Sequence, residues 1–184
     1  DLRVARSTDR GRNFEGQAVL DSSSCICCRT SIAAGPDGSV HALWRHVFPG
    51  NVRDLTAARS MDGAESFAAP VRVHDDGWVL NGCPDIGPDV AVSEDGAVHA
   101  AWYTGAPGRT GLWYARSTDR GTSFSAPVAL LPAGHAPPSQ VKLATAYHHF
   151  WAVWEDRRGI PVRIRFGTPG EGRGVAVGEG EFPT

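Results

Sequence analysis

The sequence predicts an all-β fold, a β-propeller of four-stranded antiparallel blades, with about three and a half blades present as a partial or open ring. Two recurring strings predict it. The first, Leu-x-x-Ala-Arg-Ser-x-Asp, begins at Leu2, Leu55 and Leu112, and the second, Asp-Gly-x-Val-His-Ala-x-Trp, ends at Trp44 and Trp102. The 22 Gly and 13 Pro residues among 184 also favour short strands joined by turns.

The repeat divides the single propeller region, residues 1–184, into blades. Residues 1–20 are expected to form strands three and four of one blade, residues 29–74 and 87–131 a whole blade each, and residues 140–178 a degenerate blade. In the blade at 29–74 we expect strands near residues 31–35, 40–45, 55–60 and 69–74, and no substantial helix. A β-sandwich is the alternative, but nothing in a sandwich requires this repeat.

Successive connections of an antiparallel meander alternate between two edges of the blade. The turn edge is expected to carry the Asp-Gly hairpins between strands one and two and the turns between strands three and four. The linker edge is expected to carry the blade-to-blade linkers and the loops between strands two and three. Because the longer and chemically more varied segments fall on the linker edge, we expect a functional site there.

The three turns that follow the Leu-x-x-Ala-Arg string have similar sequences and resemble the Asp-box of the bacterial neuraminidase (sialidase) repeat. The residues that carry the resemblance are Ser7, Asp9, Gly11, Phe14, Ser60, Asp62, Phe67, Ser117, Asp119, Gly121 and Phe124. In such a turn the Asp is expected to accept backbone N–H groups, the Gly to adopt a special φ, and the aromatic ring to pack under the sheet. The resemblance implies a propeller fold, and the turn itself is expected to be structural.

The same resemblance implies one alternative function, a sialidase-like exo-glycoside hydrolase. Sialidases hold a substrate carboxylate with three arginines and use a Tyr nucleophile with a Glu partner and an Asp acid. The candidates here are Arg29, Arg45, Tyr103 and Glu155, with Arg53, Tyr147, Asp54 and Asp85 as further choices. Arg45, Tyr103 and Glu155 each follow a repeated Trp and are expected to converge toward the propeller axis.

Four cysteines, Cys25, Cys27, Cys28 and Cys83, lie in linkers expected at the linker edge. A shift of 58 residues places Cys25 on Cys83, so corresponding linkers of adjacent blades carry thiols. A disulfide from Cys83 to one of the other three is the favoured interpretation, and it indicates an extracytoplasmic (periplasmic or secreted) protein. A soft metal such as copper or zinc at the cysteines, with His46 or His74 nearby, and free thiols are the alternatives.

Two further features limit the functions that the sequence allows. The repeated histidines His41 and His99 fall within inner strands, where packing is a commoner role than catalysis. The formal charge of −2, with Arg scattered among Asp and Glu, gives no basic patch for nucleic acid, and the apolar runs are too short for direct membrane insertion.

The main functional prediction is a non-catalytic extracytoplasmic propeller module for binding or assembly, without a cofactor. Since the sequence opens in the middle of a blade at Asp1, we expect missing residues or a second chain to cover the open blade faces. The partner is expected to be a protein in a larger complex, which could be membrane-associated. We expect its contacts around residues 1–20 and 140–178.

Overall fold

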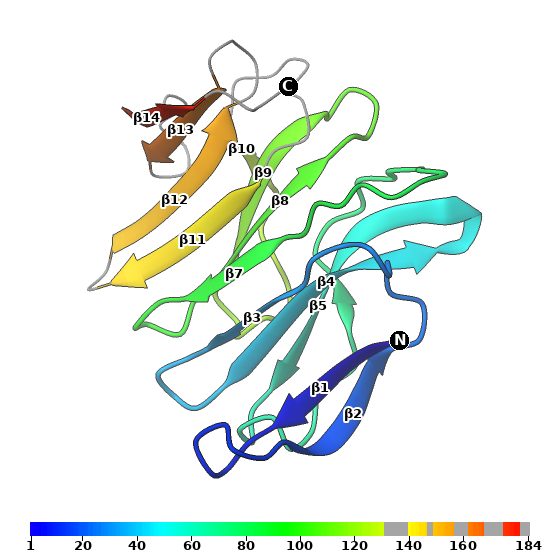
Figure 1. The fold of residues 1–184 in the computed structure, drawn as a ribbon, viewed down its shortest axis with the longest axis vertical. Helices are drawn as coiled ribbons and strands as arrows, with labels where there is room; N and C mark the ends of the chain where they lie inside the picture. Colours follow the sequence, from blue (N-terminus) through cyan, green and yellow to red (C-terminus); the bar gives the residue numbers. More distant parts are fainter. Residues whose placement is uncertain (131–139, 147–148, 157–161, 168–174, 181–184) are drawn as a thin grey trace.

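The computed structural model describes residues 1–130, 140–146, 149–156, 162–167 and 175–180, and it arranges them in four antiparallel sheets (Figure 1). The first sheet has two strands, β1 (Leu2–Arg6) and β2 (Glu15–Asp21). The second has β3 (Ser31–Ala34), β4 (Val40–Phe48), β5 (Val52–Ser60) and β6 (Val71–Arg72). The third has β7 (Asp89–Val92), β8 (Val98–Thr104), β9 (Gly111–Ser117) and β10 (Val128–Ala129). The fourth has β11 (Val141–Ala146), β12 (His149–Asp156), β13 (Val162–Gly167) and β14 (Val175–Gly180).

The three four-stranded sheets are successive propeller blades, and this confirms the predicted fold class. Their strands follow chain order, each strand pairing with the next. The first strands of the blades line the inside, where β7 lies between β3 and β11 (Figure 1). The Asp89 carboxylate at the start of β7 accepts hydrogen bonds from the Ser31 hydroxyl at 2.8 Å and from Lys142 Nζ at 2.9 Å, so it links all three inner strands. Within the described ranges, the only helical element is a 3-10 turn at Pro49–Asn51.

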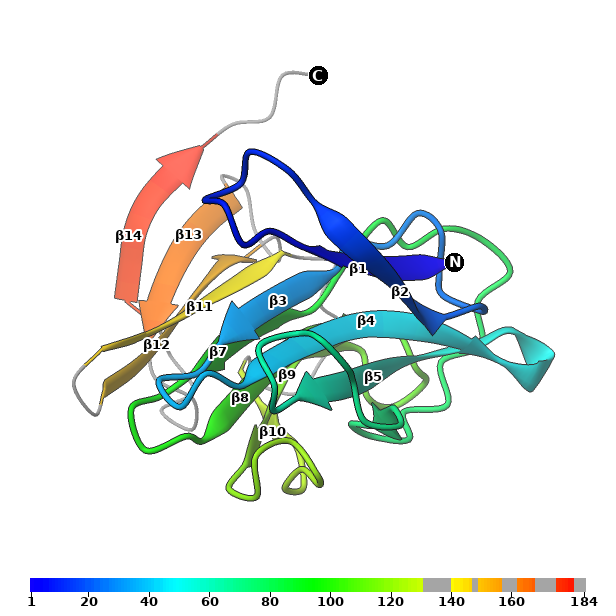
Figure 2. The same ribbon diagram turned by 90° about the horizontal axis from the view of Figure 1, so that it is seen from below.

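Strand register places the two kinds of connection at opposite edges. Val40 pairs with Ser60 at the turn edge, and Phe48 pairs with Val52 at the linker edge. The backbone N–H of Cys25 donates to the Arg45 carbonyl at 2.8 Å, which brings the cysteine linker to the linker edge as predicted. The half blade β1–β2 lies beside β3 and β4 (Figure 2), where Leu2 and Leu20 pack against the buried cluster of Ala42, Trp44 and Ala58.

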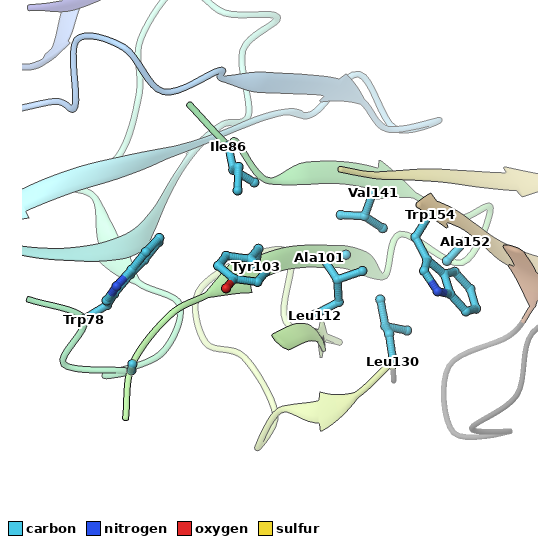
Figure 3. Packing of buried hydrophobic residues seen from close by; sticks show 10 residues of the cluster. Trp78, Ile86, Ala101, Tyr103, Leu112, Leu130, Val141, Ala152 and Trp154 are labelled. Atoms are coloured by element: carbon cyan, nitrogen blue, oxygen red, sulfur yellow. The ribbon is translucent and has the colours of Figure 1, made fainter. Parts of the chain in front are cut away.

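The repeated tryptophans are the centre of the packing between blades. Trp44 and Trp102 are 1% and 0% exposed, because neighbouring blades cover both faces of the second strands. Each indole N–H donates to an aspartate in the preceding linker, Trp44 to Asp21 at 2.5 Å and Trp102 to Asp76 at 2.7 Å. Figure 3 shows the apolar cluster between the last two blades, in which Trp154 lies beside Ala152. The sequence did not reveal the aspartate partners.

The three similar turns share one hydrogen-bond pattern. The serine hydroxyl donates to the aspartate at 2.7 Å in each, and the aspartate accepts two backbone N–H groups from the residues three and four positions later. The backbone N–H of Asn13 and the hydroxyl of Ser7 lower the pKa of Asp9 to about 2. Hydrogen bonds from Ser123, through its side chain and its backbone N–H, likewise lower the pKa of Asp119 to about 2.

The residue whose N–H binds the serine hydroxyl has positive φ in all three turns: Gly11 (φ 83), Ala64 (φ 68) and Gly121 (φ 78). The middle copy is a variant whose glycine, Gly63 (φ 70), stands one place earlier. One detail of these turns differs from the prediction. Phe14 is 65% exposed, whereas the expectation was that it packs under its sheet. The half blade has only strands β1 and β2 in the described residues, so no inner strands cover this ring. Phe67 and Phe124 pack against buried clusters as expected.

Candidate functional site at the linker edge

A buried stack of three side chains lies beneath the linker edge. Arg45 is 1% exposed, and its guanidinium lies 4.8 Å from the centroid of the Trp78 ring. Its Nη1 donates to the Arg53 carbonyl at 2.7 Å and its Nη2 to the Tyr103 carbonyl at 2.8 Å. Trp78 meets the Tyr103 ring edge-on at 5.7 Å. Arg45 and Tyr103 therefore lie close together inside the packed interior. Their convergence with Glu155 toward the propeller axis stays a prediction.

Burial shifts the pKa values of the titratable side chains in this stack. Removal from water lowers the pKa of Arg45 to about 10 and raises the pKa of Tyr103. Gly105 permits the close packing, because a Cβ at that position would lie 2.7 Å from the Trp78 ring. Neither the Arg45 guanidinium nor the Tyr103 ring is presented to solvent, so a dissolved substrate meets neither without rearrangement of the Trp78 linker.

Asp54 holds that linker in place. It is fully buried and accepts the backbone N–H groups of Gly77 at 2.9 Å and Trp78 at 3.1 Å, together with an ion pair from Arg72. A carboxylate with these fixed donors positions the Trp78 linker. It is not placed as a solvent-facing acid.

Arg29 differs from the other candidate arginines. It lies two residues before β3, its side chain is exposed, and it has no hydrogen-bond or ion-pair partner in the part of the chain that the structure describes. The backbone beneath it is closely packed, since a Cβ at Gly87 would lie 2.2 Å from the Arg29 carbonyl oxygen. A fixed backbone with an unengaged guanidinium can receive an anionic ligand.

Two polar residues precede the neighbouring inner strands. Asp85 is exposed, four residues before β7, with φ 48, and its carbonyl accepts a hydrogen bond from Gln140 Nε2 at 3.3 Å. Gln140 directly precedes β11. Because β3, β7 and β11 lie side by side, Arg29, Asp85 and Gln140 together form what we call the inner rim of the linker edge.

The remaining candidates are placed as follows. Glu155 lies in β12 and is half-buried, and its backbone N–H donates to the Gln140 carbonyl at 3.3 Å. Arg53 donates through Nε to the Leu80 carbonyl at 3.0 Å and through Nη1 to Cys25 Sγ at 3.1 Å. Tyr147 lies outside the described residues.

All four cysteines are paired in disulfides, Cys25 with Cys28 and Cys27 with Cys83. The second joins the linkers on either side of the blade β3–β6, as expected from their corresponding positions. Disulfides are compatible with an oxidising compartment. The metal alternative stays a prediction: Cys25, Cys27 and Cys28 have Sγ atoms within 4.8 Å of one another, and copper or zinc binding would require reduction to thiolates. His46 and His74 instead contact the buried Asp21 and Asp76, at 2.7 and 2.9 Å.

A cavity of about 270 Å³ opens at the turn edge, away from the inner rim. His99 lines it, with Nε2 3.0 Å from the Ser93 hydroxyl and Nδ1 2.8 Å from the Tyr114 hydroxyl. In the preceding blade His41 Nε2 lies 3.1 Å from Ser39 Oγ, so both repeated histidines contact a serine hydroxyl, although Ser39 and Ser93 stand at different positions of the repeat. Burial lowers the pKa of His99 to about 4 and raises that of Tyr114 to about 12, as expected for a packed neutral pair.

We expect His99 to make stability depend on pH. Its pKa falls from 6.5 in the unfolded chain to about 4 in the folded one, so the unfolded chain binds the proton more readily. The contribution is complete above pH 6.5 and is lost as pH falls toward 4, with about 2 kcal/mol lost by pH 5. Urea unfolding at pH 7.5 and pH 5 measures this loss. His99→Gln should show a smaller loss, and an equal loss in both proteins would contradict the assignment.

The sequence and the fold were compared with known proteins. No protein-family model matches the sequence, and no curated protein matches it. Among solved structures, a protein of unknown function from Dyadobacter fermentans DSM 18053 is 19% identical with a TM-score of 0.60, covering 89% of this chain and 47% of that one. Hadza microbial sialidase Hz136 is 19% identical with a TM-score of 0.57, covering 91% of this chain and 38% of that one.

A mutant of NanB sialidase from Streptococcus pneumoniae is also similar, at 16% identity and a TM-score of 0.54, covering 85% of this chain and 24% of that one. This chain therefore spans less than half the length of each of the three. No helix among the described residues is long and apolar enough to cross a membrane. The chain shares with these sialidases the fold of blades around a central axis.

Proposed function

We propose that the chain is part of a sialidase-like exo-glycoside hydrolase that binds an acidic sugar at the inner rim. The observation that carries the proposal is the exposed, unengaged Arg29 guanidinium on a rigid backbone at the start of an inner strand. A guanidinium binds a carboxylate through two parallel hydrogen bonds, and the exposed carboxylate of Asp85 near the next inner strand is the proposed acid. The likeness to sialidase propellers supports a glycosidase more than a non-catalytic module.

The proposal assigns different roles to the other candidates. Arg45 and Tyr103 act as positioning residues that hold the Trp78 linker, because both are buried. The remaining groups of a catalytic set are proposed to come from other parts of a larger ring, since substrate charge is stabilised from several directions. We also propose that the three similar turns are Asp-boxes of the bacterial neuraminidase repeat, supported by their shared hydrogen bonds.

Arg29→Ala tests this function directly. We expect the complete ring that contains this chain to hydrolyse a fluorogenic sialoside and the variant to lose about 100-fold or more in kcat/KM, because a charged contact to the substrate carboxylate is removed. Arg12→Ala is the matched control, since Arg12 is exposed at the turn edge and should leave turnover unchanged. Turnover that survives Arg29→Ala would contradict the proposed site.

A second candidate is the non-catalytic extracytoplasmic module for binding or assembly. The burial of Arg45 and Tyr103 favours it, because two of the four catalytic candidates serve packing. In this function a protein partner, or a complex at a membrane, covers the open blade faces, and no cofactor is needed. Absence of sialoside turnover by the complete ring, together with a stable complex in analytical ultracentrifugation, would favour the module.

A further inference from the structure

The two disulfides at the linker edge are close enough for a thiolate released from one to attack the other. Cys25 Sγ lies 3.7 Å from Cys27 Sγ, although each belongs to a different disulfide. A short turn produces this contact, in which the backbone N–H of Cys28 donates to the Cys25 carbonyl at 3.3 Å. Thiol–disulfide exchange needs a thiolate in contact with a sulfur of another disulfide. The four sulfurs meet that requirement without a large movement of the chain.

The surroundings of the sulfurs distinguish their roles. Cys25 is 5% exposed and its Sγ accepts a hydrogen bond from Arg53 Nη1 at 3.1 Å. Cys28 is half-exposed and Cys83 is exposed. A neighbouring guanidinium stabilises a thiolate and makes it a better leaving group. An external thiolate is therefore expected to attack the accessible Cys28 and to expel Cys25 beside Arg53.

We propose that the cluster is a thiol–disulfide exchange site whose co-substrate is a dithiol. One thiolate of the dithiol attacks Cys28 Sγ, the Cys25–Cys28 bond breaks, and Cys25 leaves as a thiolate. The Cys25 thiolate then attacks Cys27 Sγ, a Cys25–Cys27 bond forms, and Cys83 leaves as a thiolate. The second thiol of the dithiol attacks its own sulfur in the mixed disulfide and releases Cys28. The dithiol is oxidised to a disulfide, and the protein gains two electrons and two protons as the thiols of Cys28 and Cys83.

The consequence is the loss of the cross-link between two linkers while one disulfide remains. Cys27–Cys83 connects the linker before β3 to the linker before β7, which also carries Asp85 of the inner rim. After exchange, the linker that carries Cys83 is held only by its noncovalent contacts. The exchange site is independent of the proposed hydrolase activity, because it requires none of the inner-rim side chains.

Partial reduction tests the exchange. The folded protein is treated with one equivalent of dithiothreitol, labelled with N-ethylmaleimide, and digested with trypsin without reduction. Residues 13–29 then carry Cys25, Cys27 and Cys28 in one peptide, and residues 73–109 carry Cys83 in another. We expect one label on each peptide, no cross-link between them, and fragmentation that places the labels on Cys28 and Cys83. Two labels on residues 13–29 with the cross-link retained, or labels on Cys27 and Cys83, would overturn the proposal.

Two sets of variants test the route. In Cys25→Ser/Cys28→Ser, which keeps Cys27–Cys83, we expect Cys83 to be released about tenfold more slowly than in the native protein. Release at the native rate would show direct reduction of Cys83 and would overturn the relay. Arg53→Gln should slow the release and Arg53→Lys should restore it, because a cation at this position stabilises the Cys25 thiolate. Release of Cys83 at the same rate in Arg53→Gln and in Arg53→Lys would contradict a role for Arg53 in the exchange.

Discussion

Replacing Cys27 and Cys83 together by serine is expected to lower the free energy of unfolding by about 4 kcal/mol. The disulfide links residues that are 56 positions apart, and such a link removes much of the conformational entropy of the unfolded chain. It also connects the linkers at both ends of the blade β3–β6. Urea unfolding of the oxidised proteins, monitored by tryptophan fluorescence, measures the difference.

The matched control is Cys25→Ser/Cys28→Ser, which removes the other disulfide. Its cysteines are only three positions apart, so the entropic contribution is smaller, about 2 kcal/mol. Each double variant replaces one disulfide by two hydroxyls, and the two variants differ chiefly in the size of the loop that the disulfide closes. Equal losses in the two variants would contradict the assignment of the long cross-link to Cys27 and Cys83.

Trp102→Ala is expected to lower the free energy of unfolding by a similar amount, about 3–5 kcal/mol. The indole is fully buried between blades and donates to Asp76 at 2.7 Å, so the substitution leaves both a cavity and a carboxylate without one of its donors. Asp76 keeps its contacts with His74 and Arg109. Chemical denaturation gives the loss, provided that the variant is purified in folded form.

Trp102→Phe separates the two contributions. Phenylalanine keeps most of the apolar volume but has no N–H to donate, so the expected loss is about 1–2 kcal/mol. A loss as large as that of Trp102→Ala would assign most of the energy to the hydrogen bond with Asp76. A loss below about 1 kcal/mol for Trp102→Ala would contradict the burial of this indole between blades.

The cross-link that stabilises the fold also helps to hold the proposed site in place. The linker edge consists mostly of loops, and its rigidity comes from the cross-link and from two buried contacts, Asp54 beneath Gly77 and Trp78 and Arg45 beneath the Trp78 ring. Such supports allow exposed groups like Arg29 and Asp85 to hold their positions. Preorganised groups bind a charged ligand more strongly than mobile ones.

The sequence alone determined the blades and the assignment of connections to edges. Hydrogen-bonded turns such as Ser117–Asp119 and hairpins such as Asp37-Gly38 depend on residues a few positions apart, so local strings reveal them. Strand alternation is likewise local. The approximate positions of β3, β4 and β5 followed directly from this information.

The tertiary structure decided what lies far apart in the chain. The partner of Cys83 among three neighbouring cysteines depends on where a linker 56 positions away is placed, and the sequence contains no measure of that distance. The same holds for Asp21 and Asp76, which meet Trp44 and Trp102 from 23 and 26 positions away. Arg45 looked like a candidate for the site because it is charged and follows a strand tryptophan. Only the packing of adjacent blades showed that its guanidinium is buried under Trp78, whereas Arg29, at the start of an inner strand, remains exposed.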